Sequence, residues 1–227
     1  MAGLLTLEVK NFLKLATAKG VGFKFLTRFY SEYKTFGGDF EENLKGFLKK
    51  HFPKRVEEIQ THLKREEFFK KLFTFLEKNG VKVIPFFVQE YPKKLLEWEI
   101  PAIYLIGELP ERGFSIVGTR KASEEGKKKA REFAKALAQN GFTVISGGAS
   151  GIDLQAHWGA LEGGGKTGIV AGEGIYRFLK NNPALAGKVL KNGGFILSQF
   201  SPLTAGARWT FPKRNALIAY FGNYGTL

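Results

Sequence analysis

From residue 113 onward the sequence repeats the order strand, glycine-containing turn, helix, and this repetition limits the fold more than any other feature. Short apolar runs at 114–117, 142–145, 167–170 and 195–197 predict strands. Helical spacing of apolar residues between these runs predicts helices that cross from one strand to the next. Strands that alternate with helices form a parallel sheet with helices on its faces. We therefore predict a doubly wound α/β domain with a mostly parallel sheet.

The first part of the chain has a different composition. Fourteen of the 22 Phe precede residue 113, in segments whose apolar residues recur at helical spacing. We predict a small helical domain over 1–80, a connecting segment with two strands over 81–112, and the α/β domain over 113–227. The stretch Lys19-Gly20-Val21-Gly22 between two apolar segments looks like a helix-hairpin-helix turn. Such a turn either offers amide groups to a phosphate or is a tight corner without a ligand.

Charge and residue usage exclude several kinds of function. The 227 residues include no Cys, which excludes disulfides, thiolate nucleophiles and Cys-based metal sites, and the three scattered His are too few for a metal cage. We expect neither a metal nor a cofactor. No apolar run reaches 18 residues, so we expect a cytoplasmic protein without membrane contact. The net charge of +14 favours a polyanionic partner such as nucleic acid, although a solvated basic surface would carry the same charge.

Two glycine-containing turns follow the first two strands of the α/β domain. Ligands of doubly wound folds bind beyond the carboxyl ends of the strands, so we expect the turns 118–123 and 146–151 to lie side by side. The second turn combines three glycines with two serines, and the first supplies Thr119, Arg120 and Lys121. Amides, hydroxyls and cations in this combination suit a phosphate. The alternative is that the glycines only allow a helix and a strand to approach closely.

A third candidate segment spans 208–215 and opens the final helix, which we expect to begin near Arg214. It interleaves aromatic and cationic side chains: Trp209 and Phe211 with Arg208, Lys213 and Arg214. Aromatic rings stack on bases and cations hold the adjacent phosphates, which is typical of single-strand binding. In the alternative interpretation the two rings only fill the edge of the sheet.

Familiar catalytic and nucleotide-binding motifs do not fit. The fingerprint G-x-G-x-x-G is absent after the first strand of the α/β domain, so NAD is not expected. The stretch 163–167 resembles the end of a P-loop, but it follows a helix and precedes a strand, which is the reverse of the required order. Asp153 and His157 share one helix face, yet we favour capping and packing roles over an acid–base pair. We predict no catalytic residues.

Taken together, the motifs resemble those of the DNA-processing protein DprA (Smf) family. The resemblance covers nearly the whole chain and rests on Tyr91-Pro92, Pro101-Ala102-Ile103-Tyr104, Ile116-Val117-Gly118-Thr119-Arg120, 146–153, Gly164-Gly165-Lys166-Thr167, Leu197-Ser198-Gln199-Phe200 and Phe211-Pro212-Lys213-Arg214-Asn215. The family implies a Rossmann-like domain joined to a small SAM-like or helix-hairpin-helix-like domain. It also implies a homodimer that binds single-stranded DNA without sequence preference and loads RecA recombinase on incoming strands in natural transformation, without catalysis.

The resemblance also assigns the residues of a DNA site. Phe211 would stack on a base. The residues that bind phosphate would be Gly118, Thr119, Arg120, Lys121, Ser146, Gly147, Gly148, Ala149, Ser150, Lys213, Arg214 and Asn215. Family members usually continue beyond this last motif into a further strand, whereas this chain ends at Leu227, which leaves the sheet edge, the dimer and the RecA contact open. Gln199 and Gly148 depart from the acidic and larger apolar residues that the family often has there.

Two other functions remain as alternatives. Lysine-decarboxylase-like nucleotide-binding enzymes or sensors use a similar fold, but their Pro-Gly-Gly-x-Gly-Thr stretch is not found in this sequence. A scaffold that binds protein partners through the Phe-rich N-terminal part would be indifferent to nucleic acid.

Overall fold

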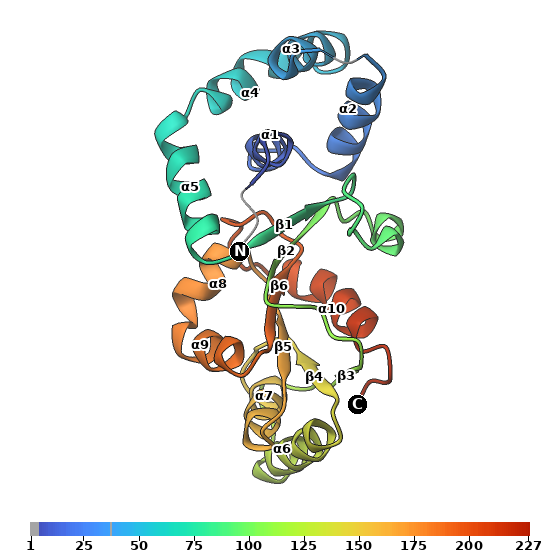
Figure 1. The fold of residues 1–227 in the computed structure, drawn as a ribbon, viewed down its shortest axis with the longest axis vertical. Coiled ribbons are helices and arrows are strands. Elements are labelled where there is room, and N and C mark those ends of the chain that lie inside the picture. The colour runs from blue at the N-terminus through green and yellow to red at the C-terminus, as the bar shows by residue number, and fades with distance from the viewer. Residues whose placement is uncertain (1–4, 37) are drawn as a thin grey trace. The chain divides into compact units, whose positions relative to one another are not determined.

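The computed structural model describes residues 5–36 and 38–227 (Figure 1). The chain forms two compact units, Met1–Ile103 and Tyr104–Leu227, and the segment 81–112 contributes to both. No helix in the described part of the chain is long and apolar enough to cross a membrane.

The first unit is mainly helical. Its helices are α1 (Leu7–Ala16), α2 (Phe23–Phe36), α3 (Phe40–His51), α4 (Val56–Leu63) and α5 (Glu66–Lys78), with a 3₁₀ turn at Pro53–Arg55. Asp39 caps α3, because its side chain accepts hydrogen bonds from the backbone N–H groups of Glu41 and Glu42. The core is rich in aromatic rings, with Phe29 in edge-to-face contact with Phe40 and Phe47. Aromatic packing thus accounts for the Phe-rich composition of this unit.

Gly20 turns the chain between α1 and α2 with a φ of 68°, a conformation that favours glycine. The guanidinium of Arg55 donates to the carbonyl oxygen of Gly20 at 3.0 Å and also to that of Lys19. The turn is therefore held by a side chain of the same unit, as a tight corner between helices requires.

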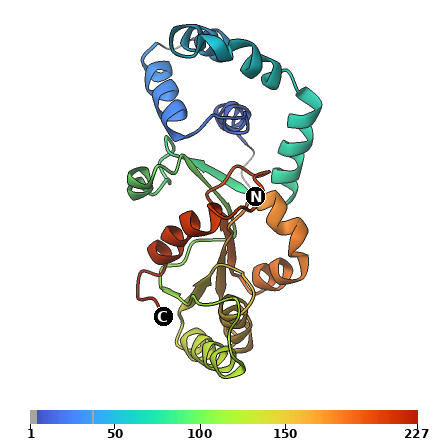
Figure 2. The same cartoon turned by 180° about the vertical axis from the view of Figure 1, so that it is seen from behind.

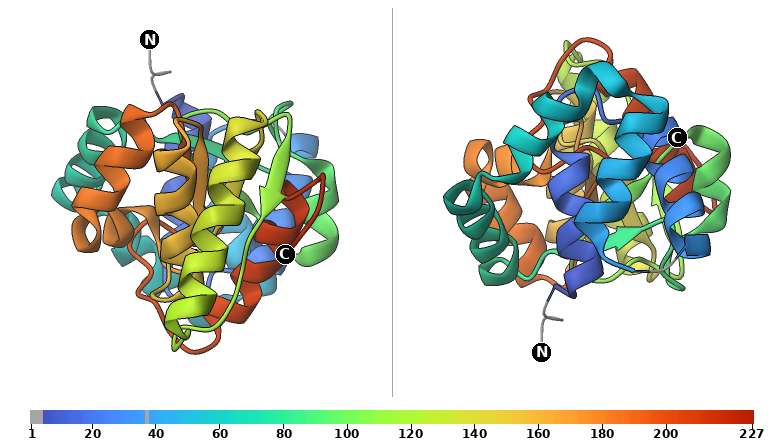
Figure 3. Two further views of the ribbon diagram at one scale, coloured as in Figure 1. Left: turned by 90° about the horizontal axis from the view of Figure 1, so that it is seen from below. Right: turned by 90° about the horizontal axis from the view of Figure 1, so that it is seen from above.

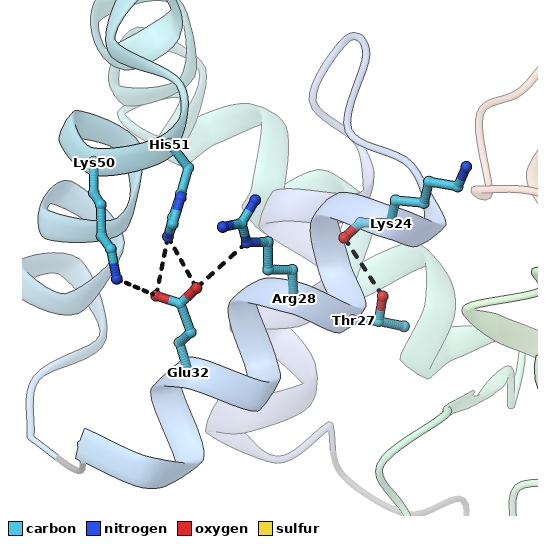
Figure 4. Close-up of polar contacts among 6 residues, drawn as sticks. All are labelled: Lys24, Thr27, Arg28, Glu32, Lys50 and His51. Carbon is cyan, nitrogen blue, oxygen red and sulfur yellow. Dashed lines mark hydrogen bonds and ion pairs between the residues drawn. The ribbon is translucent and has the colours of Figure 1, made fainter.

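A polar cluster joins α2 to α3 at the surface of this unit (Figure 4). The carboxylate of Glu32 lies 2.9 Å from His51 Nε2, 3.5 Å from Lys50 Nζ and 3.4 Å from Arg28 Nε. The hydrogen bond from His51, together with these charges, lowers the pKa of Glu32. Arg28 and Lys50 are exposed to solvent, so we expect their ion pairs with Glu32 to contribute little to stability.

The structure contains a six-stranded sheet with the order β1-β2-β6-β5-β4-β3, and strands β3 to β6 with most of β2 belong to the second unit. The strands are β1 (Lys82–Pro85), β2 (Ala102–Ile106), β3 (Gly113–Ser115), β4 (Thr143–Ser146), β5 (Thr167–Val170) and β6 (Phe195–Ser198). Strands β3 to β6 are parallel, with Ser115 opposite Ile145 and Ile169 opposite Ile196. Strand β2 pairs with β6 in the antiparallel direction. This arrangement confirms the predicted mostly parallel, doubly wound fold.

Helices cover both faces of this sheet (Figures 1 and 2). They are α6 (Glu124–Gln139), α7 (Ile152–Glu162), α8 (Ile175–Asn181), α9 (Pro183–Lys191) and α10 (Thr210–Phe221). Helices α6 and α7 lie side by side on one face, whereas α10 lies on the other (Figure 3). The expected start of the last helix near Arg214 is wrong, because α10 begins at Thr210. Pro212 stands in its first turn, where the N–H that proline lacks has no helical partner to lose.

Small side chains allow α6 and α7 to approach closely. Ala134 and Ala138 of α6 share a buried cluster with Ala156 and Ala160 of α7. Gly159 lies directly against α6, where an added Cβ would collide with the carbonyl oxygen of Arg131.

Gly159→Ala is therefore expected to lower the free energy of unfolding by about 1–3 kcal/mol, because the two helices must separate. Gly187→Ala is the matched control, since Gly187 stands in α9 where an added Cβ would meet open space. This control should raise the free energy of unfolding by up to about 1 kcal/mol through helix propensity. Urea denaturation measures both, and equal responses would contradict the close approach of α6 and α7.

Candidate nucleic-acid interface

The structure brings the two glycine-containing turns together at the carboxyl ends of β3 and β4. The backbone N–H of Ile152 donates to the carbonyl oxygen of Thr119 at 3.3 Å. Gly151 adopts a φ of 84°, and an added Cβ would collide with the carbonyl oxygens of Thr119 and Arg120. Only glycine allows this contact between the turns.

Several amides of these turns point inward, toward the buried carboxylate of Asp153. The N–H of Gly147 donates to Asp153 Oδ2 at 3.2 Å, and the N–H groups of Ala149 and Gly118 also face this carboxylate. These amides are occupied by the protein itself. We therefore expect a ligand at this edge to contact mainly side chains, because these backbone N–H groups point away from it.

The predicted phosphate-binding residues separate into exposed and buried groups. Gly118, Thr119, Arg120, Lys121, Ser150, Lys213 and Asn215 are exposed, Gly148 and Ala149 are half-buried, and Ser146, Gly147 and Arg214 are buried. The hydroxyl of Ser146 donates to the carbonyl oxygen of Ile116 at 2.6 Å. Ser146 thus joins the ends of two strands below the surface, and the exposed residues form the accessible rim.

Arg214 lies beneath the turns and is only 4% exposed. Its Nη1 donates to the carbonyl oxygen of Gly147 at 2.7 Å and to that of Val170, while Nε donates to Asn215 Oδ1 at 3.2 Å. Burial raises the pKa of Asp153, while the charge of Arg214 and the facing N–H groups act in the opposite direction. Arg214 and Lys213 are neighbours in the predicted phosphate-binding segment, but Lys213 is exposed and Arg214 is buried.

The aromatic residues of the third segment are also placed differently from each other. The guanidinium of Arg120 lies over the ring of Phe211, 4.6 Å from its centroid, and Gly172 lies so close that a Cβ there would collide with the ring. Trp209 is 60% exposed and touches the ring of Phe200 edge-on. The open ring at this edge is therefore Trp209, which the predicted site did not include.

His157 is completely buried below this edge, on α7. Its Nδ1 lies 2.7 Å from Thr167 Oγ1, and the Thr167 hydroxyl donates to the carbonyl oxygen of Val144. The ring therefore carries its proton on Nδ1 and donates it to Thr167. Burial, followed by the charge of Arg214, lowers the pKa of His157 to about 3.

This low pKa predicts a loss of stability in acid. Below pH 6.5 the histidine of the unfolded chain takes up a proton, whereas His157 of the folded chain stays neutral until the pH nears 3. The free energy of unfolding should therefore fall by about 1.4 kcal/mol per pH unit across this window, or about 2 kcal/mol from pH 6.5 to 5. His157→Asn, whose amide still reaches toward Thr167, should lack this part of the slope. Urea denaturation at several pH values measures both proteins. The same pH dependence of the free energy of unfolding in both would contradict the low pKa of His157.

A metal is not suggested by the side chains at hand. Within residues 5–36 and 38–227, no group of three or more His, Cys, Asp or Glu side chains is arranged to hold a metal ion. The edge instead gathers cations and one exposed ring, which is the composition of an anion-binding surface.

Comparison with known proteins identifies the family. The family model described as DNA recombination-mediator protein A matches residues 82–224. The chain belongs to this family. Protein Smf of a Synechocystis strain is 34% identical over 161 residues, which are 65% of this chain and 40% of that protein. The chain spans about half or less of the length of the curated members that it matches.

Solved structures of the family share the fold. DNA processing protein A (DprA) from Streptococcus pneumoniae has a TM-score of 0.61 and 22% identity, covering 93% of this chain and 75% of its own. DNA processing protein A from Helicobacter pylori, a protein described for its single-stranded DNA binding mode, has a TM-score of 0.51 and 24% identity over 62% of this chain and 65% of its own. The Rossmann-like fold expected from the motifs is thereby confirmed.

Proposed function

We propose that this chain binds single-stranded DNA without sequence preference, at the carboxyl edge of the sheet. The observation that carries the proposal is the convergence there of exposed Arg120 and Lys121 from one turn with Trp209 and Lys213 from the start of α10. Arg120 links the two parts, because its guanidinium lies over Phe211 of α10. The Helicobacter pylori relative, whose structure was described for single-stranded DNA binding, supports this choice of ligand.

The chemistry of this edge favours a single strand over a duplex or a free nucleotide. Cations contact phosphates irrespective of the base, and an exposed ring stacks on any base that is not paired. We propose Trp209 as the first stacking residue and Phe211 as a second one that requires Arg120 to move from its ring. Arg120, Lys121 and Lys213 would contact the phosphates, with the hydroxyls of Thr119 and Ser150 beside them.

The wider role follows the family. We propose that binding serves DNA recombination in natural transformation, that a homodimer loads RecA recombinase on the bound strand in the cytoplasm, and that no catalysis is involved. Asp153 and His157, the acid and base nearest the site, support a non-catalytic role because both are buried and engaged with the protein itself.

Fluorescence anisotropy of labelled oligo-dT at several KCl concentrations tests the proposal. Arg120→Ala should weaken binding to oligo-dT and to a mixed-sequence strand equally, and should reduce the slope of log affinity against log salt by about 0.7 for each lost phosphate contact. Trp209→Ala should weaken binding by about 1–3 kcal/mol with little change of this slope. Lys191→Ala, at the end of α9, removes the same charge as Arg120→Ala away from the site and should leave both quantities unchanged.

Competitors complete this experiment. Duplex DNA and free nucleotides should displace oligo-dT poorly. Displacement by a nucleotide at low concentration would overturn the proposal in favour of a small-molecule pocket, and loss of affinity in Lys191→Ala equal to that in Arg120→Ala would show that only the net charge matters.

A further inference from the structure

The buried carboxylate of Asp153 contacts both turns of the candidate site. It accepts from the N–H of Gly147 in the second turn, and the N–H groups of Ala149 and of Gly118 face it as well. Gly118 belongs to the first turn and Ala149 to the second. One side chain in the first turn of α7 therefore ties together two loops that follow different strands.

Arg214 completes this arrangement from the other face of the sheet. Its guanidinium donates to the carbonyl oxygens of Gly147 and Val170, which lie at the ends of β4 and β5. Because Arg214 lies one turn into α10, these bonds fix the start of that helix relative to the strands. Phe211 and Lys213 stand in the same stretch of helix, so their positions depend on where Arg214 is held.

Burial of both groups requires that they compensate each other. Asp153 and Arg214 are each 4% exposed, and an isolated charge at such a depth would be strongly disfavoured. Burial lowers the pKa of Arg214, while the negative charge of Asp153 opposes this effect. Neither side chain can contact a DNA strand at the surface, because both are buried.

We propose that Asp153 and Arg214 are a buried positioning pair that sets the geometry of the DNA-binding edge, and that neither residue touches DNA. Asp153 holds the two turns against each other through their N–H groups, and Arg214 joins the start of α10 to β4 and β5. The pair acts through Arg120, Lys121 and Lys213. This inference rests on the proposed function and adds two buried residues that position the side chains of the DNA-binding edge.

The effect of Asp153→Asn on DNA affinity tests the inference, because a direct electrostatic role and a positioning role predict opposite signs. Removal of a negative charge next to a DNA site should strengthen binding if only electrostatics matter. A positioning role requires weaker binding, about tenfold, since the amide group of asparagine cannot accept from three N–H groups in the same way. Glu132→Gln, on the exposed face of α6, removes the same charge as a control and should leave affinity unchanged.

Arg214→Lys provides the second variant. Lysine keeps the positive charge but cannot span the carbonyl oxygens of Gly147 and Val170 as a planar guanidinium does. Affinity should fall about tenfold while the salt slope stays that of the wild-type protein, because no phosphate contact is lost. A fall of about 0.7 in the slope would instead place Arg214 on a phosphate and overturn the inference.

Amide NMR spectra of the free protein separate this inference from the proposed function. Asp153→Asn should shift the resonances of Gly118, Gly147 and Ala149, whereas Glu132→Gln should not. Shifts confined to the second turn would overturn the joint role of Asp153. Shifts in both turns together with indifference of the wild-type protein to DNA would retain the positioning pair and reject the proposed ligand.

Discussion

Gly151→Ala is expected to weaken single-stranded DNA binding by about 100-fold. Gly151 has a φ of 84° and a ψ of −130°, and a methyl group there would collide with the carbonyl oxygens of Thr119 and Arg120. The first turn must then move away from the second, and Arg120 and Lys121 move with it. Backbone strain alone should also lower the free energy of unfolding by about 1–3 kcal/mol.

Gly164→Ala is the matched control for this variant. Gly164 also has a positive φ, of 72°, but its missing Cβ would meet open space, and it lies between α7 and β5 at the opposite edge of the sheet. The control should lose stability through strain and keep its DNA affinity. Anisotropy with oligo-dT and urea denaturation measure the two effects, and equal affinities of both variants would mean that the contact between the turns does not support binding.

Arg214→Met is expected to lower the free energy of unfolding by about 3–5 kcal/mol, because it leaves the buried carboxylate of Asp153 without its compensating charge. Lys213→Met removes the same charge from the neighbouring residue, which is exposed, and should change the free energy of unfolding by no more than about 0.5 kcal/mol. A similar small loss in both variants, measured by urea denaturation, would contradict the role of Arg214 as the partner of Asp153.

The loss in Arg214→Met should also depend on pH. Burial already raises the pKa of Asp153, and removal of Arg214 takes away a charge that opposes this rise. The folded variant then binds a proton more readily than the unfolded chain does. The difference in free energy of unfolding between Arg214→Met and the wild-type protein should therefore be largest at neutral pH. It should become smaller as the pH falls toward the raised pKa of the Asp153 carboxyl group.

Local patterns sufficed to predict the architecture. A serine stands directly before the helix that follows the first turn, and the hydroxyl of this Ser123 accepts from the N–H of Gly126 at 3.1 Å, as a helix cap does. The strands of the parallel sheet were predicted because each is a short, continuously apolar run between turns. The helix Ile175–Asn181 was missed, since seven residues with one charged side chain on each turn give no clear period.

The different burial of Lys213 and Arg214 was not predicted, because it depends on the residue at which α10 begins. Lys213 and Arg214 are neighbours of similar charge, but α10 begins at Thr210 and its buried face runs through Thr210, Arg214, Leu217, Ile218 and Phe221. The spacing of four, seven, eight and eleven residues places Arg214 inside. This spacing identifies Arg214 as buried only for a helix that begins at Thr210, four residues before the expected start.

The direction of the turn amides could not be predicted from the turns themselves. Glycines and serines before a helix are equally compatible with a ligand outside and with an acceptor inside. Asp153 decides between them, and its depth is set by the packing of α7 on the sheet, which no local pattern contains. The exposed cations of the site could therefore be predicted from the sequence, whereas the direction in which its backbone amides point could not.

With the guanidinium of Arg120 over its ring, Phe211 is shielded in the free protein from flat molecules that carry no phosphate. A free nucleobase that displaced Arg120 would gain one stacking contact and lose another of comparable strength. A DNA strand avoids this loss, because its phosphate offers the displaced guanidinium a new partner. We therefore expect the Phe211 ring to open only to a ligand that brings a base and a charge together, so that free bases and nucleosides do not occupy this ring.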